Sequence, residues 1–338
     1  MPLPAVLRLI FLSSLWGASF LFMRIATPAL GVFPTAFFRV FFGALGLIAV
    51  LLVWRVRWRF DGKFVTTLVI GMINSGLPFA LFCVAARFIP AGYSALLNAS
   101  TPLMGVLIGA ACFSERLTRE RLGGVVVGMM GVAVLVVSGP VALSSGLMIG
   151  ALACLGAAAC YGISGFLVGR WIAQRGGLDS RLIALGSQLG ATLLLAPLML
   201  GQVTLQPTAG EWHDVHVWLA LLALGLACTS LAYLLYFRLV EELGPIKPLT
   251  VTLLVPLFGV LWGALFLDEQ VTWAHAAGGA LIALALWLIL FKRPAGRGET
   301  LEQPSAGKPA TTGTTAGATA ATAVAQGEAA SVRSERRT

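Results

Sequence analysis

The chain has 338 residues, of which 58% are hydrophobic and only 11% are charged, and its mean hydropathy is +0.90. Soluble domains carry roughly 25% charged residues, so this composition excludes an ordinary soluble enzyme. The net charge of +9 does not indicate nucleic-acid binding either, because Lys and Arg form short clusters between apolar runs. We therefore expect an all-α integral membrane protein that contacts lipid and no nucleic acid.

Ten apolar runs are long enough for membrane helices, which need about 20 residues to cross the hydrocarbon core. The first run is too long for a signal peptide and no basic segment precedes it, so we expect it to remain in the mature protein. In chain order, the predicted helices cover residues 5–26, 34–54, 64–86, 92–113, 121–138, 146–169, 181–200, 216–237, 247–267 and 272–291.

The loop charges predict how these helices are oriented. Basic residues concentrate after the even-numbered runs, as in residues 55–63, whereas the loops after odd-numbered runs hold little positive charge beyond Arg87. Because basic loops face the cytoplasm, both termini are predicted to be cytoplasmic, and the location to be the cell inner (plasma) membrane. Residues 294–338 contain no aromatic residue and are rich in Ala, Thr and Gly, which predicts a disordered cytoplasmic tail.

An internal repeat relates the two halves of the chain. The segment from Thr101 to Glu115 resembles the segment from Val255 to Glu269, and one constant offset pairs Pro102 with Pro256 and the two glutamates with each other. The predicted units are residues 1–138, an outer linker at 139–145, and residues 146–293. Because each unit holds five helices, an odd number, the units must cross the membrane in opposite directions. Such inverted repeats recur in secondary transporters, which bind substrate between the halves.

These motifs also carry a family resemblance. The opening Trp16-Gly-Ala-Ser19, Arg39 early in the second run, and the paired Pro…Gly-x-x-x-Gly…Glu blocks are similar to the EamA-type branch of the drug/metabolite transporter superfamily. The resemblance covers about residues 5–291. It implies a secondary carrier, often an exporter of amino acids or related small metabolites, and it does not specify one substrate.

The fourth run contains the first candidate substrate-binding residues. Ser94, Asn98, Thr101 and Gly105 follow helical spacing and would share one face of a continuous helix. Pro102, and Pro256 in the ninth run, are expected to interrupt their helices, and paired interruptions indicate a binding site. The alternative is that the polar residues only hold helices together around a kink.

Aromatic and amide side chains in other runs are further candidates. Trp16, Tyr161 and Tyr233 combine an apolar face with a polar edge, which suits amphipathic metabolites. Asn74, in the third run, is a candidate for lining the same cavity. For each aromatic residue, packing in the core or anchoring at the membrane interface is the alternative.

Charged residues within the runs limit the classes of substrate that the protein could transport. We expect Arg24 to extend to the headgroups, whereas Arg39 lies deeper and would meet a substrate carboxylate or a backbone carbonyl. No carboxylate lies in the middle of any run. Glu115 and Glu269 lie at helix ends, as caps or gate residues. A proton-coupled exporter of cations needs a buried acid, so zwitterionic, neutral or anionic metabolites fit better.

The predicted function is secondary transport of small organic metabolites by alternating access, in the direction of export. The alternatives are an importer or bidirectional facilitator, or a membrane scaffold or regulatory protein. No nucleotide-binding, metal-binding or catalytic motif occurs in the sequence, so we expect no enzymatic activity, no cofactor and no metal. A monomer is expected because the chain contains its own repeat, with a dimer as the alternative.

Overall fold

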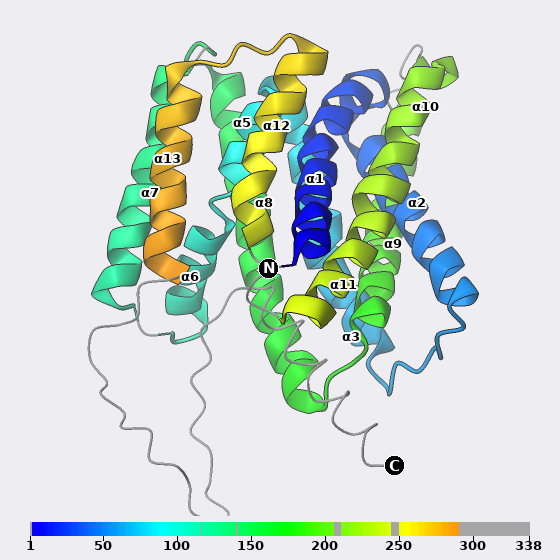
Figure 1. Ribbon diagram of the computed structural model, residues 1–338. Coiled ribbons are helices and arrows are strands. Elements are labelled where there is room, and N and C mark those ends of the chain that lie inside the picture. The colour runs from blue at the N-terminus through cyan, green and yellow to red at the C-terminus, as the bar shows by residue number, and fades with distance from the viewer. Residues whose placement is uncertain (1, 116, 140, 206–210, 245–249, 291–338) are drawn as a thin grey trace, which may run out of the picture.

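The computed structural model describes residues 2–115, 117–139, 141–205, 211–244 and 250–290, and their regular secondary structure is entirely helical (Figure 1). The predicted tail at 294–338 lies outside the described residues. The helices of the first half are α1 (Leu3–Leu30), α2 (Val32–Val53), α3 (Phe64–Gly71), η1 (Met72–Gly76), α4 (Leu77–Phe88), α5 (Ala91–Asn98), α6 (Thr101–Cys112) and α7 (Arg119–Ser138). Those of the second half are α8 (Ser145–Trp171), η2 (Ala173–Arg175), α9 (Ser180–Leu205), η3 (Glu211–His213), α10 (Val215–Leu222), η4 (Ala223–Leu231), α11 (Ala232–Leu243), α12 (Val251–Leu267) and α13 (Trp273–Leu290).

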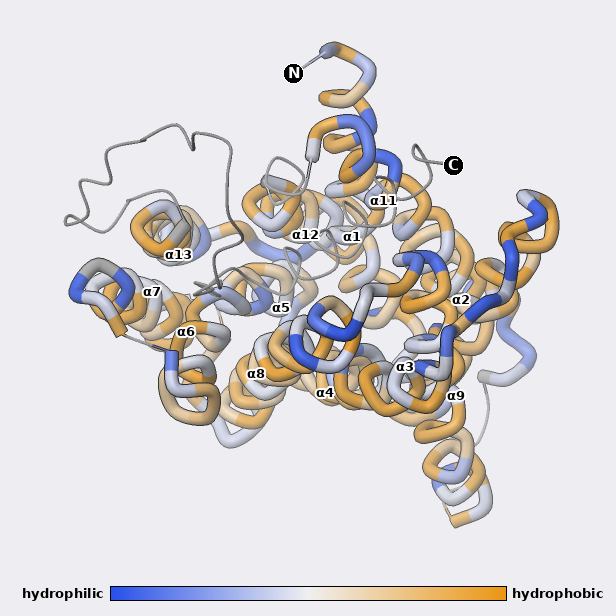
Figure 2. The backbone as a smooth tube through the Cα atoms, turned by 90° about the horizontal axis from the view of Figure 1, so that it is seen from below, coloured by the Kyte–Doolittle hydropathy of each residue, from blue (hydrophilic) through white to orange (hydrophobic). Residues whose placement is uncertain are grey.

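Seven helical stretches of the described chain are long and apolar enough to cross a membrane, and an eighth is added if α5 and α6 count as one bent span. Helices α12 and α13 are apolar but shorter. Together these stretches lie at the ten predicted apolar runs. The tube in Figure 2 shows the apolar character of the helices, with hydrophilic residues concentrated at their ends and in the connections. The chain is thus a multi-pass membrane protein.

Helices of one half pack mainly on helices of the other. Helix α1 packs on α12 and α11, whereas α8 packs on α6 and α4. Helix α2 packs on α9 and η4, whereas α9 also packs on α3 and η1. Helices α7 and α13 lie side by side at one edge of the bundle (Figure 1). The core is therefore shared between the halves and belongs to neither alone.

The crossing of α3 and α9 depends on glycine. A Cβ atom at Gly71 would lie 2.1 Å from the carbonyl oxygen of Ser187, and one at Gly190 would lie 2.0 Å from that of Leu68. These atoms are backbone and cannot move aside, so the two helices reach this distance only because neither glycine has a side chain. Close approach through small residues replaces the hydrophobic driving force that is missing between helices in lipid.

The fourth predicted helix is broken. Helix α5 ends at Asn98 and α6 begins at Thr101, with a bend of 42° between them. Pro102 causes the break, because it has no N–H for the carbonyl of Asn98 and its ring clashes with that carbonyl. The Thr101 hydroxyl donates to this freed carbonyl at 2.7 Å. The prediction of one continuous face through Ser94, Asn98, Thr101 and Gly105 was therefore wrong.

Pro256 does not act in the same way. Helix α12 continues through this residue from Val251 to Leu267, so the predicted pair of interruptions is found only at Pro102. Instead, both halves depart from α-helical geometry in their third predicted helix. Met72–Gly76 and Ala223–Leu231 form π-helices, and such wide turns occur frequently at functional sites. They present Asn74 and Ser75 in the first half and Thr229 and Ser230 in the second.

Candidate functional site

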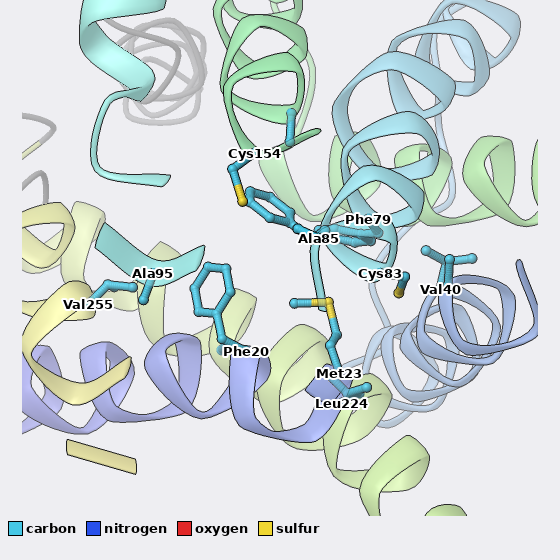
Figure 3. Close-up of a cluster of buried hydrophobic side chains, with 14 of the residues drawn as sticks. Phe20, Met23, Val40, Phe79, Cys83, Ala85, Ala95, Cys154, Leu224 and Val255 are labelled. Atoms are coloured by element: carbon cyan, nitrogen blue, oxygen red, sulfur yellow. The ribbon is translucent and has the colours of Figure 1, made fainter. Parts of the chain in front are cut away.

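The most unusual side chain of the bundle interior is Arg39 of α2, which is only 5% exposed. Its Cζ lies 3.7 Å from the centroid of the Phe79 ring, and Nη1 donates to the Sδ of Met23 at 3.3 Å. Nε has no hydrogen-bond partner. Figure 3 shows Met23 extending from α1 toward Phe79 of α4. Among the described residues, Arg39 thus meets a ring and a thioether and not the backbone carbonyl that was one expected partner; the substrate carboxylate stays a prediction.

These contacts compensate the charge of Arg39 only in part. Burying an unpaired charge costs several kcal/mol even after relaxation of the protein. A cation over an aromatic ring recovers about 0.5–2 kcal/mol, and a thioether is a weak acceptor. Arg24 differs, because its guanidinium donates to the backbone carbonyl of Ala86 in α4. This carbonyl lies near the end of α4, and the expectation that Arg24 extends to the headgroups stays a prediction.

Polar side chains from both halves meet close to Arg39. Ser164 of α8 donates to Oδ1 of Asn74 at 2.8 Å, and Gln188 of α9 donates to Ser75 at 3.1 Å. The Tyr233 hydroxyl of α11 lies close enough to interact with both Ser75 and Gln188. We call Arg39, Asn74, Ser75, Ser164, Gln188 and Tyr233 the central cluster.

Aromatic side chains of several helices contact one another in the same part of the bundle. Phe20 of α1 meets Phe82 of α4 edge-on at 5.4 Å between centroids, and Phe82 lies 6.3 Å from Tyr161 of α8. Trp16 lies 5.7 Å from Tyr236. The charge of Arg39 acts on the hydroxyls of both Tyr161 and Tyr233. The members of the site differ in accessibility. The half-buried ones are Trp16, Asn74, Tyr161 and Tyr233, and the buried ones are Arg39, Ser75, Ser164 and Gln188.

The predicted residues of the fourth run, Asn98 and Thr101, form hydrogen bonds with each other. Thr101 holds the Asn98 carbonyl, and its hydroxyl lies 3.4 Å from Oδ1 of Asn98. A cavity of about 410 Å³ lies beside this segment, between α5, α12 and α13, and its lining includes Leu96, Ala99 and Pro256. Its walls are almost entirely apolar, and none of the central cluster lines it. It therefore differs in place and in chemistry from the central cluster.

The two predicted gate residues have the same local backbone. Each follows a residue with positive φ (58° at Ser114 and 53° at Asp268). Each donates its own N–H to the carbonyl of a glycine six residues earlier, at 2.9 Å for Glu115 and 3.2 Å for Glu269. The correspondence of the repeats therefore extends from the sequence to the backbone geometry.

The side chains of these two acids have different partners. Glu269 accepts the N–H groups of Ala91 at 2.6 Å and Gly92 at 3.0 Å, so it caps the start of α5 from the end of α12. A negative charge at a helix N-terminus satisfies free N–H groups and complements the helix dipole. Glu115 instead lies 3.8 Å from Arg121. The residues 245–249 that match the start of α5 lie outside the described part of the chain.

Sequence reasoning missed four residues here: Ser164 and Gln188 of the central cluster, and Met23 and Phe79, which contact Arg39. Gln188 is fully buried, and the signal was available, because it is an amide within an otherwise apolar run. Phe79 and Met23 gave no signal, since apolar residues in an apolar run are indistinguishable from lipid-facing ones. Only their position around the Arg39 guanidinium identifies them.

The comparisons with known proteins now decide the family. The model of the EamA-like transporter family matches residues 3–137 and 148–291, which lie within the two predicted halves. The chain belongs to the EamA-like transporter family. This EamA protein is a transporter and not an enzyme.

Relatives of this EamA protein cover most of its length. It is 27% identical over 294 residues to a protein of Salmonella typhimurium named "Probable amino-acid metabolite efflux pump", covering 82% of this chain and 91% of the relative. It is 22% identical to the "Uncharacterized transporter YoaV" of Bacillus subtilis, covering 85% and 96% of the two chains. A solved structure titled "Crystal structure of protein" has the same fold, with a TM-score of 0.60 and 21% identity over 84% of this chain and 95% of that one.

Proposed function

We propose that this protein exports small organic metabolites, such as amino acids or related amphipathic compounds, across the cell inner membrane by alternating access. The observation that carries the proposal is the central cluster, in which polar side chains of both halves are buried together between aromatic rings. Ionisable side chains within a membrane bundle are rare and face the interior, where they mark substrate pathways, and Arg39 lies beside these polar groups. The names of relatives support export, since a further one is a "Probable terminal-alkyne amino-acid exporter" of Streptantibioticus cattleyicolor, 26% identical over 64% of this chain.

The proposed architecture is ten membrane helices in two inverted repeats, with both termini in the cytoplasm. The helix contacts support it, because exchanging each helix for its counterpart reproduces the pattern. The pair α1 and α12 becomes α8 and α6, while the pair α2 and η4 becomes α9 and η1. The matching π-helices of the two halves support it as well. The basic loops after even-numbered helices set the proposed orientation.

The two glutamates provide the proposed gates. With the orientation above, the Glu269 cap joins α12 to α5 at the outer end of the bundle. In the opposite state, Glu115, which has the equivalent position and backbone geometry in the first half, would close the inner end. Each gate would thus depend on one of the two equivalent carboxylates, and only one gate would be closed at a time. One chain supplies both gates, so the proposed unit is a monomer without cofactor or metal.

Export is tested by comparing metabolites in the medium of cells that carry the wild-type chain, an empty vector, or a variant. Tyr233→Phe removes a hydroxyl from the central cluster without changing the ring. Tyr93→Phe is the matched control, because Tyr93 packs against His275 away from the cluster. We expect a few compounds to be enriched with the wild type and the control, and several-fold less with Tyr233→Phe.

The outcomes separate the alternatives. Compounds depleted from the medium instead of enriched would indicate an importer. Equal enrichment with both variants would keep transport and contradict the assignment of the central cluster. Media identical to the empty vector in every case, with uptake also absent in proteoliposomes, would favour a scaffold or regulatory protein.

A further inference from the structure

Arg39 is the buried cation for which the described part of the chain offers no counter-ion. The ion pairs of the described residues join Arg8 and Arg238 to Glu242, Arg59 to Asp61, Arg121 to Glu115 and Arg181 to Asp179. All of these lie near helix ends or in connections. Among the described residues, no carboxylate comes within ion-pair distance of Arg39, and its Nε has no hydrogen-bond partner. The Nε–H of this guanidinium is therefore a buried donor without an acceptor in the described part of the chain.

The guanidinium lies beside the more accessible part of the site. Arg39 acts electrostatically on the hydroxyls of Tyr161 and Tyr233, and both tyrosines are half-buried. An anion arriving from that side would displace the Met23 sulfur, the weakest partner of the guanidinium, and would reach two hydroxyl donors at once. Arginine suits this role because its planar fork binds both oxygens of a carboxylate.

The same surroundings offer nothing comparable to a cation. Within the described residues, the central cluster holds amide and hydroxyl groups but no acid. An ammonium group on the substrate would therefore find hydrogen bonds but no opposite charge. The rings of Phe20, Phe82 and Trp16 provide an apolar wall for the remainder of the molecule.

We propose that Arg39 is the anchor for a substrate carboxylate, and that the transported compounds are amphipathic monocarboxylates for which a carboxylate is required and an α-ammonium group is not. This inference rests on the proposed transport function. According to this proposal, 2-hydroxy acids and N-acyl amino acids are as suitable as substrates as amino acids are. It excludes amines and amino-acid amides, which lack the anion.

Uptake by proteoliposomes of the full-length protein tests the proposal with three labelled probes of one shape. L-phenylalanine carries both charges, L-phenylalaninamide lacks the carboxylate, and 3-phenyllactate lacks the ammonium group. The corresponding leucine series covers a smaller side chain. We expect the amino acid and the hydroxy acid to be transported within a few-fold of each other, and the amide at least tenfold more slowly.

The variants identify the anchor. Arg39→Gln is expected to slow carboxylate transport at least tenfold, whereas Arg39→Lys, which keeps the charge, recovers part of it. Arg24→Gln is the matched control, because Arg24 binds a backbone carbonyl. Thermal unfolding of each variant shows whether it is folded. If Arg39→Gln does not fold, the proposal is still tested by two measurements: the wild-type preference for the acid over the amide, and carboxylate transport by the Arg39→Lys variant.

The outcomes also separate this inference from the function beneath it. Equal transport of acid and amide, or carboxylate transport unchanged in a folded Arg39→Gln variant, would overturn the anchor and leave the transporter intact. Strict dependence on the ammonium group would overturn the proposed substrate class. If the wild type moved none of the probes of either series, this result would contradict the proposed export of amino acids and related compounds. It would also contradict the role of Arg39 as the carboxylate anchor.

Discussion

Replacing Glu269 with Gln weakens the contact that joins α12 to α5. The carboxylate accepts two backbone N–H groups, at 2.6 and 3.0 Å, and hydrogen bonds to a charged group contribute about 1.5–3 kcal/mol each. The amide keeps one acceptor oxygen, loses the charge, and turns its NH₂ toward an N–H donor. Because Glu269 is only half-buried, solvent screens part of the effect. We therefore expect a loss of about 1.5–2 kcal/mol, which is roughly a 10- to 30-fold shift in the gate equilibrium.

The shift is measured by cysteine accessibility. Ala91, which is 2% exposed, is replaced by Cys in a chain whose five native cysteines are Ala. A membrane-impermeant maleimide is then added from outside. Labelling should be about tenfold faster with Glu269→Gln than without it. The matched change Glu115→Gln should not accelerate it, since it weakens the opposite gate. Equal labelling with and without Glu269→Gln would refute the view that this cap holds the outer end closed.

Three further predictions concern stability and local bonding. Gly190→Ala should lower the thermal unfolding temperature in detergent by several degrees, because overpacking costs about 1–3 kcal/mol, whereas Gly201→Ala on the same helix meets nothing within 4 Å and should not lower it. In a double-mutant cycle, Ser164→Ala and Asn74→Ala should couple by about 0.6 kcal/mol, the typical value between membrane helices; additive effects would mean that their 2.8 Å bond contributes nothing. Thr101→Val should cost about 1 kcal/mol of stability and leave transport rates unchanged, and a tenfold loss of transport would show that the hydroxyl also contacts substrate.

The sequence predicted the positions of the helices because lipid makes hydropathy a direct structural signal. The family followed from the paired motifs, and the comparisons confirm it. The break before Pro102 was also predictable, since proline removes one hydrogen bond wherever it stands. Whether the helix then bends depends on its neighbours, however, and α12 continues through Pro256. The effect of proline on its own helix therefore identified where each helix loses a hydrogen bond. It did not predict whether the helix bends there.

For the candidate site, too, the sequence indicates some of the residues but not their contacts. A charge or an amide within an apolar run stands out in the sequence, as Arg39 and Asn74 did, and as Gln188 would have. What each of them contacts depends on packing between helices far apart in the chain. Neither the spacing of residues nor the composition indicates two of these contacts. They are the contact of Arg39 with Met23 and Phe79, and the cap that Glu269 forms on α5.

The sharing of one core by both halves has a consequence for biosynthesis. Helices α1, α2, α4, α6 and α7 leave the ribosome before the helices on which they mainly pack, namely α12, α9, α8 and α13. At about 5–20 residues per second, the first half waits roughly ten to thirty seconds in the membrane while Asn74 and Ser75 lack their partners Ser164 and Gln188 of the second half. A chain truncated after the first half should therefore be degraded, and coexpression of the second half as a separate chain should rescue it.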